Sequence, residues 1–474
     1  MATRPAPIQA QERVLSTLNV DGSRRWIRPK PSAGRWWKRR RITAYVLMLV
    51  FFIVPYLSIG GRPVLLIDLP RREFSLLGTT FYSTDTLLFM LLLVSILIGI
   101  FLATALFGRV WCGWACPQTV YMEFLFRPVE RLFEGGDRGS KRLDRQGGFS
   151  GRRVAKNAFY LVLALFLAHT FLAYFVPPAR LWTWMQGPPA QHWTSFFIVM
   201  FTTGLIFFDF AYFREQTCLV ACPYGRIQSA LLDKGSLIVG YDGRRGEPRA
   251  KGARPRPEGA GDCVDCGLCV LTCPTGIDIR EGLQMECVHC TQCMDACDRV
   301  MANVGKAPGL IRYGSRNGFE GAAKRRFRMR VVAYPLVLVA TLGLFSWALA
   351  SRSDTDVTVL RGGGEPFVVQ ADGRVLNTIR IKVRNFGADR RYGIALEGAP
   401  GAQLVAPINP LPVRSGKWET ATVFVLAPRG SFRSGMLDVE FVVQDGERLS
   451  VRRPYRLVGP EDAAPAAPTG GASK

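Results

Sequence analysis

The sequence predicts a multi-domain membrane protein with a five-helix transmembrane bundle, an inserted cysteine-rich α+β domain and a C-terminal immunoglobulin-like β-sandwich. Three observations support this prediction: five long apolar runs, a polar stretch with closely spaced cysteines, and short alternating segments after the last run. The chain has 474 residues, which is too long for one domain, and a formal net charge of +24.

Each apolar run has the length that a helix needs to cross roughly 30 Å of hydrocarbon. The expected spans are residues 43–60, 86–107, 157–176, 194–213 and 331–350. No A-x-A cleavage site follows the first run, so we expect a retained span and not a signal peptide. The first four spans then form one membrane region, 43–213, and a long polar segment separates it from the fifth span.

Arg and Lys are unevenly distributed over the polar segments. The N-terminal segment 1–42, the loop 108–156 and the segment 214–330 are rich in both, whereas loops 61–85 and 177–193 hold few. By the positive-inside rule, the N-terminus and the segment 214–330 are expected in the cytoplasm and the C-terminal domain outside it. Topology therefore explains the positive charge, and no nucleic-acid partner is expected.

Two cysteine pairs stand at the ends of the second and fourth runs. "WCGWACPQTV" holds Cys112 and Cys116, and "TCLVACPYGR" holds Cys218 and Cys222, so each pair is a C-x-x-x-C-P. If each helix continues through its pair, the spacing places both thiols on one face, where they suit a soft ion such as Cu(I). The prolines are expected to end or kink the helix just beyond. Because the pair recurs at equivalent positions of two helical hairpins, we favour a metal or redox site over buried packing cysteines.

The cysteines between 263 and 297 form a double motif. "CVDCGLCVLTCP" has the spacing C-x-x-C-x-x-C-x-x-x-C-P, and "CVHCTQCMDAC" repeats it without the final proline. This is the ligand run of bacterial ferredoxins with two 4Fe–4S clusters, in which the fourth cysteine of each half ligates the other cluster. The predicted ligand sets are Cys263, Cys266, Cys269 and Cys297 for one cluster, and Cys287, Cys290, Cys293 and Cys273 for the other. We expect a two-cluster ferredoxin-like α+β domain at about 255–305; structural zinc is the disfavoured alternative.

Three other polar or sulfur-bearing side chains lie close to these motifs. His289 falls between two predicted cluster ligands and is expected to be a solvated loop residue. Asp209, near the inner end of the fourth span, is expected to pair with Arg214 at the surface, although an acid within a membrane is also a candidate functional group. Met122 is a further candidate thioether ligand near the first pair.

Residues 354–458, after the last span, contain seven short segments that alternate apolar and polar residues between Gly, Pro and Asp turns. This pattern is typical of an immunoglobulin-like sandwich. The segment contains neither Cys nor His, so we expect a docking module and not a metal site. The composition of residues 459–474 predicts a disordered tail.

Long stretches around the cysteines resemble the CcoG/FixG/RdxA membrane ferredoxins, accessory proteins of cbb-type cytochrome c oxidase. Residues 110–132, 214–249 and 263–301 carry the resemblance. It implies a cupric reductase of the bacterial inner membrane that converts Cu(II) to Cu(I) for the oxidase's copper centre. It further implies oxidase assembly factors or a copper transporter or chaperone as partners, and copper binding and reduction at Cys112, Cys116, Cys218 and Cys222.

Two other classes of function stay open from the sequence. The first is a membrane polyferredoxin that relays electrons from quinol or a cytoplasmic donor to another complex, like the NapH and NosR group with its similar C-x-x-x-C-P pairs. The second is a non-redox assembly scaffold that docks through the immunoglobulin-like domain. The sequence names neither the electron donor nor the oligomeric state.

Overall fold

The computed structural model describes residues 16–17, 19, 21, 23–70, 72–82, 85–146, 150–251, 257–322, 329–351, 355–387, 389–446 and 450–461. The chain forms two compact units, Met1–Ser346 and Trp347–Lys474. Most of the predicted tail, 459–474, and the first part of the N-terminal segment lie outside the described residues.

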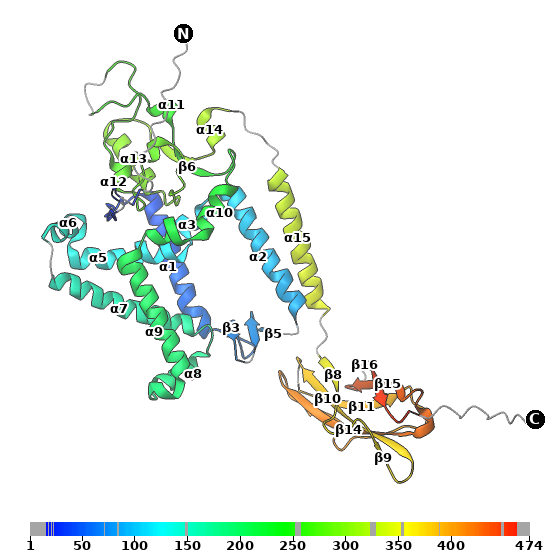
Figure 1. Cartoon of the computed structure of the whole chain (residues 1–474). Coiled ribbons are helices and arrows are strands. Elements are labelled where there is room, and N and C mark those ends of the chain that lie inside the picture. The colour runs from blue at the N-terminus through cyan, green and yellow to red at the C-terminus, as the bar shows by residue number, and fades with distance from the viewer. Residues whose placement is uncertain are drawn as a thin grey trace, which may run out of the picture. The chain divides into compact units, whose positions relative to one another are not determined.

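Within the described residues, four helical segments are long and apolar enough to cross a membrane, so the protein is a multi-pass membrane protein. They are α2 (Thr86–Phe107), α7 (Gly151–Leu172), the segment Pro189–Phe213 around α9 (Trp193–Phe208), and α15 (Met329–Ala350). Helices α2 and α15 lie side by side, and the Ser95 hydroxyl donates to the Thr341 hydroxyl at 3.1 Å (Figure 1).

The prediction of five spans is wrong at its first member, 43–60. Helix α1 (Arg35–Ile53) begins earlier, and its apolar part, 42–53, is about 18 Å long, well short of the hydrocarbon thickness. Its basic first half belongs to a protein contact, because the Asp295 carboxylate accepts hydrogen bonds from the backbone N–H groups of Trp36 and Trp37 at 3.1 and 2.7 Å. At its other end, the Phe51 carbonyl accepts a hydrogen bond from the Tyr174 hydroxyl beyond α7 at 2.8 Å.

Short elements connect these helices. A two-stranded and a three-stranded antiparallel sheet precede α2. One π-helical turn follows the helix after the first cysteine pair, and two others lie before and within the second pair. The strands are β1 (Ser58–Ile59), β2 (Arg62–Pro63), β3 (Leu65–Asp68), β4 (Glu73–Leu76) and β5 (Thr79–Tyr82). The helices are α3 (Val110–Trp114), α4 (Pro117–Tyr121), α5 (Arg127–Glu134), α6 (Gly136–Gln146), α8 (Pro178–Met185) and α10 (Pro223–Leu231), and the π-helical turns are η2 (Met122–Phe126), η4 (Asp209–Phe213) and η5 (Thr217–Ala221).

The cysteine-rich domain is closed by two antiparallel strands, β6 (Ile238–Tyr241) and β7 (Ile311–Gly314). Both lie outside the predicted limits of about 255–305, because the cysteine spacing contains no information about the strands that close the domain. Its helices are α11 (Gly243–Gly246), α12 (Leu268–Leu271), α13 (Gln292–Asn303) and α14 (Arg316–Glu320). The apolar core includes Val239, Ile277, Ile279, Met294 and Ile311 together with several of the cysteines.

The second unit is an immunoglobulin-like sandwich, as predicted. One sheet has the order β12-β14-β10-β8 with β9 beside β10, and the other has the order β13-β11-β15-β16. The strands are β8 (Thr355–Arg361), β9 (Val368–Val369), β10 (Arg374–Asn385), β11 (Arg390–Glu397), β12 (Gln403–Val405), β13 (Leu411–Val413), β14 (Trp418–Pro428), β15 (Met436–Gln444) and β16 (Ser450–Val458). The sequence pattern missed β12 and β13, which at three residues each are too short for an alternating pattern.

Candidate iron–sulfur and thiol site

The two halves of the cysteine motif fold alike. The residue after the second cysteine of each half, Gly267 or Thr291, is left-handed, with φ of 65° or 62°. A helix starts at the next residue and carries the third cysteine, Cys269 or Cys293, in its first turn. The left-handed residue turns the chain back on itself, so that the thiols of one half point around a common space.

The eight cysteines line two cavities. One cavity is lined by Cys263, Cys266, Cys269 and Cys297, and the other by Cys273, Cys287, Cys290 and Cys293, with Cys269 lining both. These are the two crossed sets that the spacing predicts, brought together because α13 carries Cys293 to one cavity and Cys297 to the other. All twelve cysteines of the chain lie in its described part, and none of them forms a disulfide.

The spacing of the thiols suits a multi-iron cluster better than a single ion. In the described part of the chain, no three His, Cys, Asp or Glu side chains lie close enough together to hold one metal ion. Zinc in a structural site needs four ligands on one small tetrahedron, whereas a cubane separates its thiolates by the width of the cluster. The residues of both cavities therefore fit 4Fe–4S clusters.

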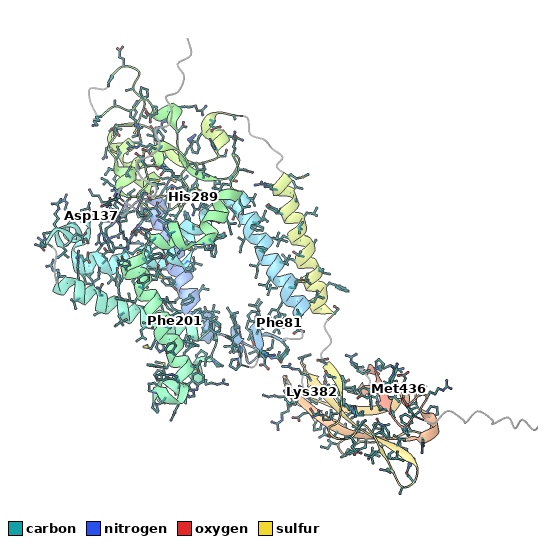
Figure 2. The ribbon with its side chains drawn as sticks, in the orientation of Figure 1. Phe81, Asp137, Phe201, His289, Lys382 and Met436 are labelled. Atoms are coloured by element: carbon teal, nitrogen blue, oxygen red, sulfur yellow. The ribbon has the colours of Figure 1, made fainter. Side chains whose placement is uncertain are left out.

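The prediction that His289 is a solvated loop residue is wrong: only 1% of it is exposed. Figure 2 shows it surrounded by other side chains. Its Nδ1 accepts a hydrogen bond from the Arg109 backbone N–H at 3.2 Å, and a Cβ on Gly113 would lie 2.6 Å from the His289 carbonyl oxygen. Burial, reinforced by the Arg109 charge, lowers the pKa of His289 to about 3, so the ring is neutral. The cysteine-rich domain is thus packed directly on the segment of the first cysteine pair.

The two cysteine pairs are flanked by matching backbone turns, although Cys112 lies in the α-helix α3 and Cys218 in the π-helical turn η5. Four residues before the first cysteine, Gly108 and Arg214 have matching angles, φ 60°, ψ −132° and φ 54°, ψ −119°. The second cysteines, Cys116 and Cys222, are extended, and the prolines after them begin α4 and α10. The expectation that each helix continues through its pair, and ends at the proline, is therefore wrong. A residue before proline is driven out of the helical region, and proline is favoured at the first position of a helix.

The structure nevertheless brings the pairs together. Cys112 and Cys218 pack in one apolar cluster with Val288 and Cys290 of the cysteine-rich domain. The Cys112 thiol donates to the Gln228 side-chain carbonyl at 3.0 Å. Burial, together with the nearby thiols of Cys116, Cys112 and Cys222, raises the pKa of Cys218 to about 12. Four thiols from two hairpins, which we call the thiol quartet, therefore lie beside the second cluster cavity.

One cavity-lining and two bridging side chains support this arrangement. The first, Met122, is the candidate thioether ligand that the sequence suggested, whereas the sequence did not indicate the bridging pair. Met122 lines a cavity together with Cys218 and Val288. The Gln292 amide, on α13, donates to the Glu123 carboxylate at 2.9 Å and so joins the cysteine-rich domain to η2. Only the packing of distant segments identifies Gln292 and Glu123, because an isolated Gln or Glu has no distinctive sequence context.

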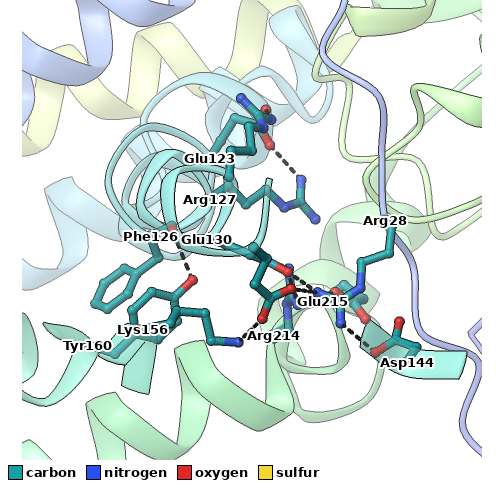
Figure 3. A network of polar contacts seen from close by, with 12 residues as sticks. Arg28, Glu123, Phe126, Arg127, Glu130, Asp144, Lys156, Tyr160, Arg214 and Glu215 are labelled. Carbon is teal, nitrogen blue, oxygen red and sulfur yellow. Dashed lines mark hydrogen bonds and ion pairs between the residues drawn. The ribbon is translucent and has the colours of Figure 1, made fainter. Parts of the chain in front are cut away.

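A buried network of charges holds the segment before the second pair (Figure 3). Arg214 donates to both oxygens of Glu130 at 3.2 and 2.7 Å, and Glu130 also pairs with Arg28 from the N-terminal segment. The expected ion pair between Asp209 and Arg214 is absent from the described residues. Asp209 instead accepts hydrogen bonds from the Gln118 amide at 3.2 Å and from the Thr217 hydroxyl.

Three family models match the chain. A 4Fe-4S dicluster domain matches residues 213–316, a 4Fe-4S binding domain matches 89–135, and an IG-like fold at the C-terminus of FixG matches 345–460. The chain is 33% identical to the nitrogen fixation protein FixG of Rhizobium meliloti, over 89% of this chain and 90% of that protein. The protein RdxA of Cereibacter sphaeroides is 35% identical, over 84% of this chain and 87% of its own length.

The chain belongs to the FixG/RdxA family. As a member of this family it is an iron–sulfur electron-transfer protein of the oxidoreductase class. The 4Fe-4S binding model covers the first cysteine pair of this FixG/RdxA chain, and the dicluster model covers the second pair and all eight motif cysteines. A crystal structure of a FixG-related protein from Vibrio parahaemolyticus matches 23% of the chain and 98% of its own length, with 16% identity and a TM-score of 0.21.

Proposed function

We propose that this FixG/RdxA-family protein reduces Cu(II) to Cu(I) at the thiol quartet, for assembly of the copper centre of a cbb-type cytochrome c oxidase. One observation carries the proposal: Cys290, a predicted cluster ligand, packs in the same apolar cluster as Cys112 and Cys218. An electron carrier bound at Cys290 would adjoin the place where a metal ion binds the quartet.

The chemistry of the quartet suits this reaction. Thiolates are soft ligands that stabilise Cu(I) relative to Cu(II), so binding to the quartet favours the reduced ion. When bound, the two clusters supply single electrons, which matches the one electron that each Cu(II) accepts. The Cys112 thiol, hydrogen-bonded to Gln228, and the partly buried Cys218 thiol lose their protons on binding the metal, since the thiolate is the ligand. Met122 is placed to add a thioether.

The wider setting is part of the same proposal. The bacterial inner membrane holds the protein, with the cysteine-rich domain in the cytoplasm and the immunoglobulin-like domain in the periplasm. The bias of Arg and Lys toward segments 108–156 and 214–330 supports this orientation. Oxidase assembly factors, or a copper transporter or chaperone, are the proposed partners.

The test is copper reduction by protein purified without oxygen and reduced with dithionite, from which excess reductant has been removed. Cu(I) is measured with a Cu(I)-specific chelator. The double variants Cys112→Ser/Cys116→Ser and Cys218→Ser/Cys222→Ser should lose both copper binding and reduction while keeping their iron. Trp111→Phe, next to the first pair and exposed, is the control for local disturbance. Parental copper reduction in both double variants would refute the proposal.

A polyferredoxin is the second candidate, and a specific observation favours it. The 4Fe-4S binding model covers the first cysteine pair, and within the described chain no three ligands converge on a single-ion site. Under this alternative the quartet holds a third cluster, and the iron content rises to about twelve per chain. A non-redox assembly scaffold, by contrast, would keep its cellular function after the cluster cysteines are replaced.

A further inference from the structure

A cavity of about 590 Å³ lies among α1, α4, α7 and α9 in the first unit. Its wall is largely apolar and includes Phe51, Leu167 and Leu205. Such a volume, with an apolar wall and few polar groups, is typical of a small-molecule site. Two lining residues, Phe171 and Leu205, are also 42% and 52% exposed on spanning helices, so the cavity opens toward the lipid.

Polar groups converge at one end of this cavity, where Gln118 and Asp209 both line it. The Gln118 amide nitrogen is occupied, because it donates to Asp209 Oδ1 at 3.2 Å and to the Arg214 carbonyl at 3.0 Å. The Thr217 hydroxyl also donates to Asp209 Oδ1. Within the described residues this leaves Gln118 Oε1 and Asp209 Oδ2 as acceptors without a protein donor. A ligand that fills this end must therefore supply hydrogen-bond donors, which quinol hydroxyl groups are.

The same cavity adjoins the thiol quartet. Ala115 and Pro117, on either side of Cys116 in the chain, both line it. A ligand in the cavity would thus lie beside the residue that carries one thiol of the quartet. A phospholipid acyl chain would fill the apolar part but offers no donor to Gln118 or Asp209, whereas a quinol has a flat apolar ring, a lipid tail and two hydroxyl groups.

We propose that this cavity binds a lipid-soluble quinol and that the quinol reduces copper at the quartet, an inference that rests on the proposed function. One quinol loses two electrons and two protons and becomes a quinone. Each electron reduces one Cu(II) to Cu(I). Each proton passes from a quinol hydroxyl to the Asp209 carboxylate, which releases the first through Thr217, beyond the end of the span, before it accepts the second.

Binding is tested first, on the full copper-free chain in lipid nanodiscs, with decylubiquinol under anaerobic conditions. Leu205→Trp fills the cavity, and Asp209→Asn turns an acceptor into a donor. Each should weaken quinol binding about tenfold or more, as expected for loss of the pocket or of a hydrogen bond to a charged group. Ile198→Trp, exposed on the same helix and outside the cavity, should bind like the parent. A photoreactive azidoquinone should label α1, α7 or α9 in the parent and not in Leu205→Trp.

Copper reduction then separates this inference from the proposed function. Leu205→Trp should lose reduction driven by decylubiquinol and keep reduction driven by dithionite. Parental quinol binding in Leu205→Trp and Asp209→Asn, or phospholipid co-purified in place of quinone, would overturn the quinol site. Absence of copper reduction with either reductant in the parent would overturn the proposed function, and the binding data would then still decide whether the cavity takes a quinol.

Discussion

Glu130→Ala should strongly destabilise the first unit and disturb the second cysteine pair. Glu130 is buried, with 6% of its surface exposed, and pairs with Arg214 through both oxygens and with Arg28. Arg214 stands four residues before Cys218, and its positive φ of 54° starts the turn toward it. The Glu130 carboxylate therefore compensates the positive charges of Arg214 and Arg28 and fixes the backbone at Arg214.

The size of the destabilisation depends on which acidic partners the guanidinium groups of Arg214 and Arg28 keep. Without Glu130, Arg214 retains Glu215 at 3.9 Å, and Arg28 retains Glu134 at 3.7 Å and Asp144 at 3.4 Å. Removing one partner of a buried ion pair costs about 3–5 kcal/mol, because a charge stays buried without compensation. Since weaker partners remain, we expect about 3 kcal/mol, and less for Glu130→Gln, which keeps the shape and one hydrogen-bond acceptor.

Thermal unfolding in detergent, followed by tryptophan fluorescence, measures this difference. Glu320→Ala is the matched control, because its ion pair with Arg316 is exposed on both sides and such pairs contribute about 0–1 kcal/mol. Glu130→Ala should also reduce copper more slowly than Glu320→Ala while keeping its iron. Equal stability of the two variants would refute the idea that this network holds the segment before Cys218.

Three further results are expected. Anaerobically purified protein should contain about eight iron and eight sulfide per chain. Cys273→Ser should disturb the cluster of the later cysteine triplet, and Cys297→Ser that of the earlier triplet. If spectroscopy shows that each variant loses the cluster of its own half of the motif, the crossed ligand sets are wrong. A reporter fused to the C-terminus should be active only outside the cytoplasm, and one in loop 141–150 only inside; the reverse pattern would invert the proposed orientation. Burial raises the pKa of Glu134, but its hydrogen bond to Lys156 and other partners lower it more, so it lies below the ordinary 4.5. The stability that it contributes is present above that value and is lost as the pH falls through the lower folded-state pKa, which acid titration of the unfolding temperature should reveal and Glu134→Gln should reduce.

Much of the architecture followed from local patterns in the sequence. Hydropathy identified four spans because the length of an apolar helix is a local property, and alternation identified the long strands of the sandwich for the same reason. The cysteine spacing divided eight thiols into the same two sets that line the two cavities. The hydropathy pattern gave a wrong prediction at α1, where the segment before the apolar run contacts Asp295 of the cysteine-rich domain.

By itself, then, the sequence determined the class of the protein, its spans from α2 onward and its candidate ligands, because each of these depends on neighbours along the chain. Only the tertiary structure placed Cys290 against Cys112 and Cys218, buried His289, and paired Arg214 with Glu130 and not with Asp209. These contacts join segments that are far apart in the sequence. No spacing rule encodes them, since they depend on how helices and the cysteine-rich domain pack to bury apolar surface and compensate buried charge.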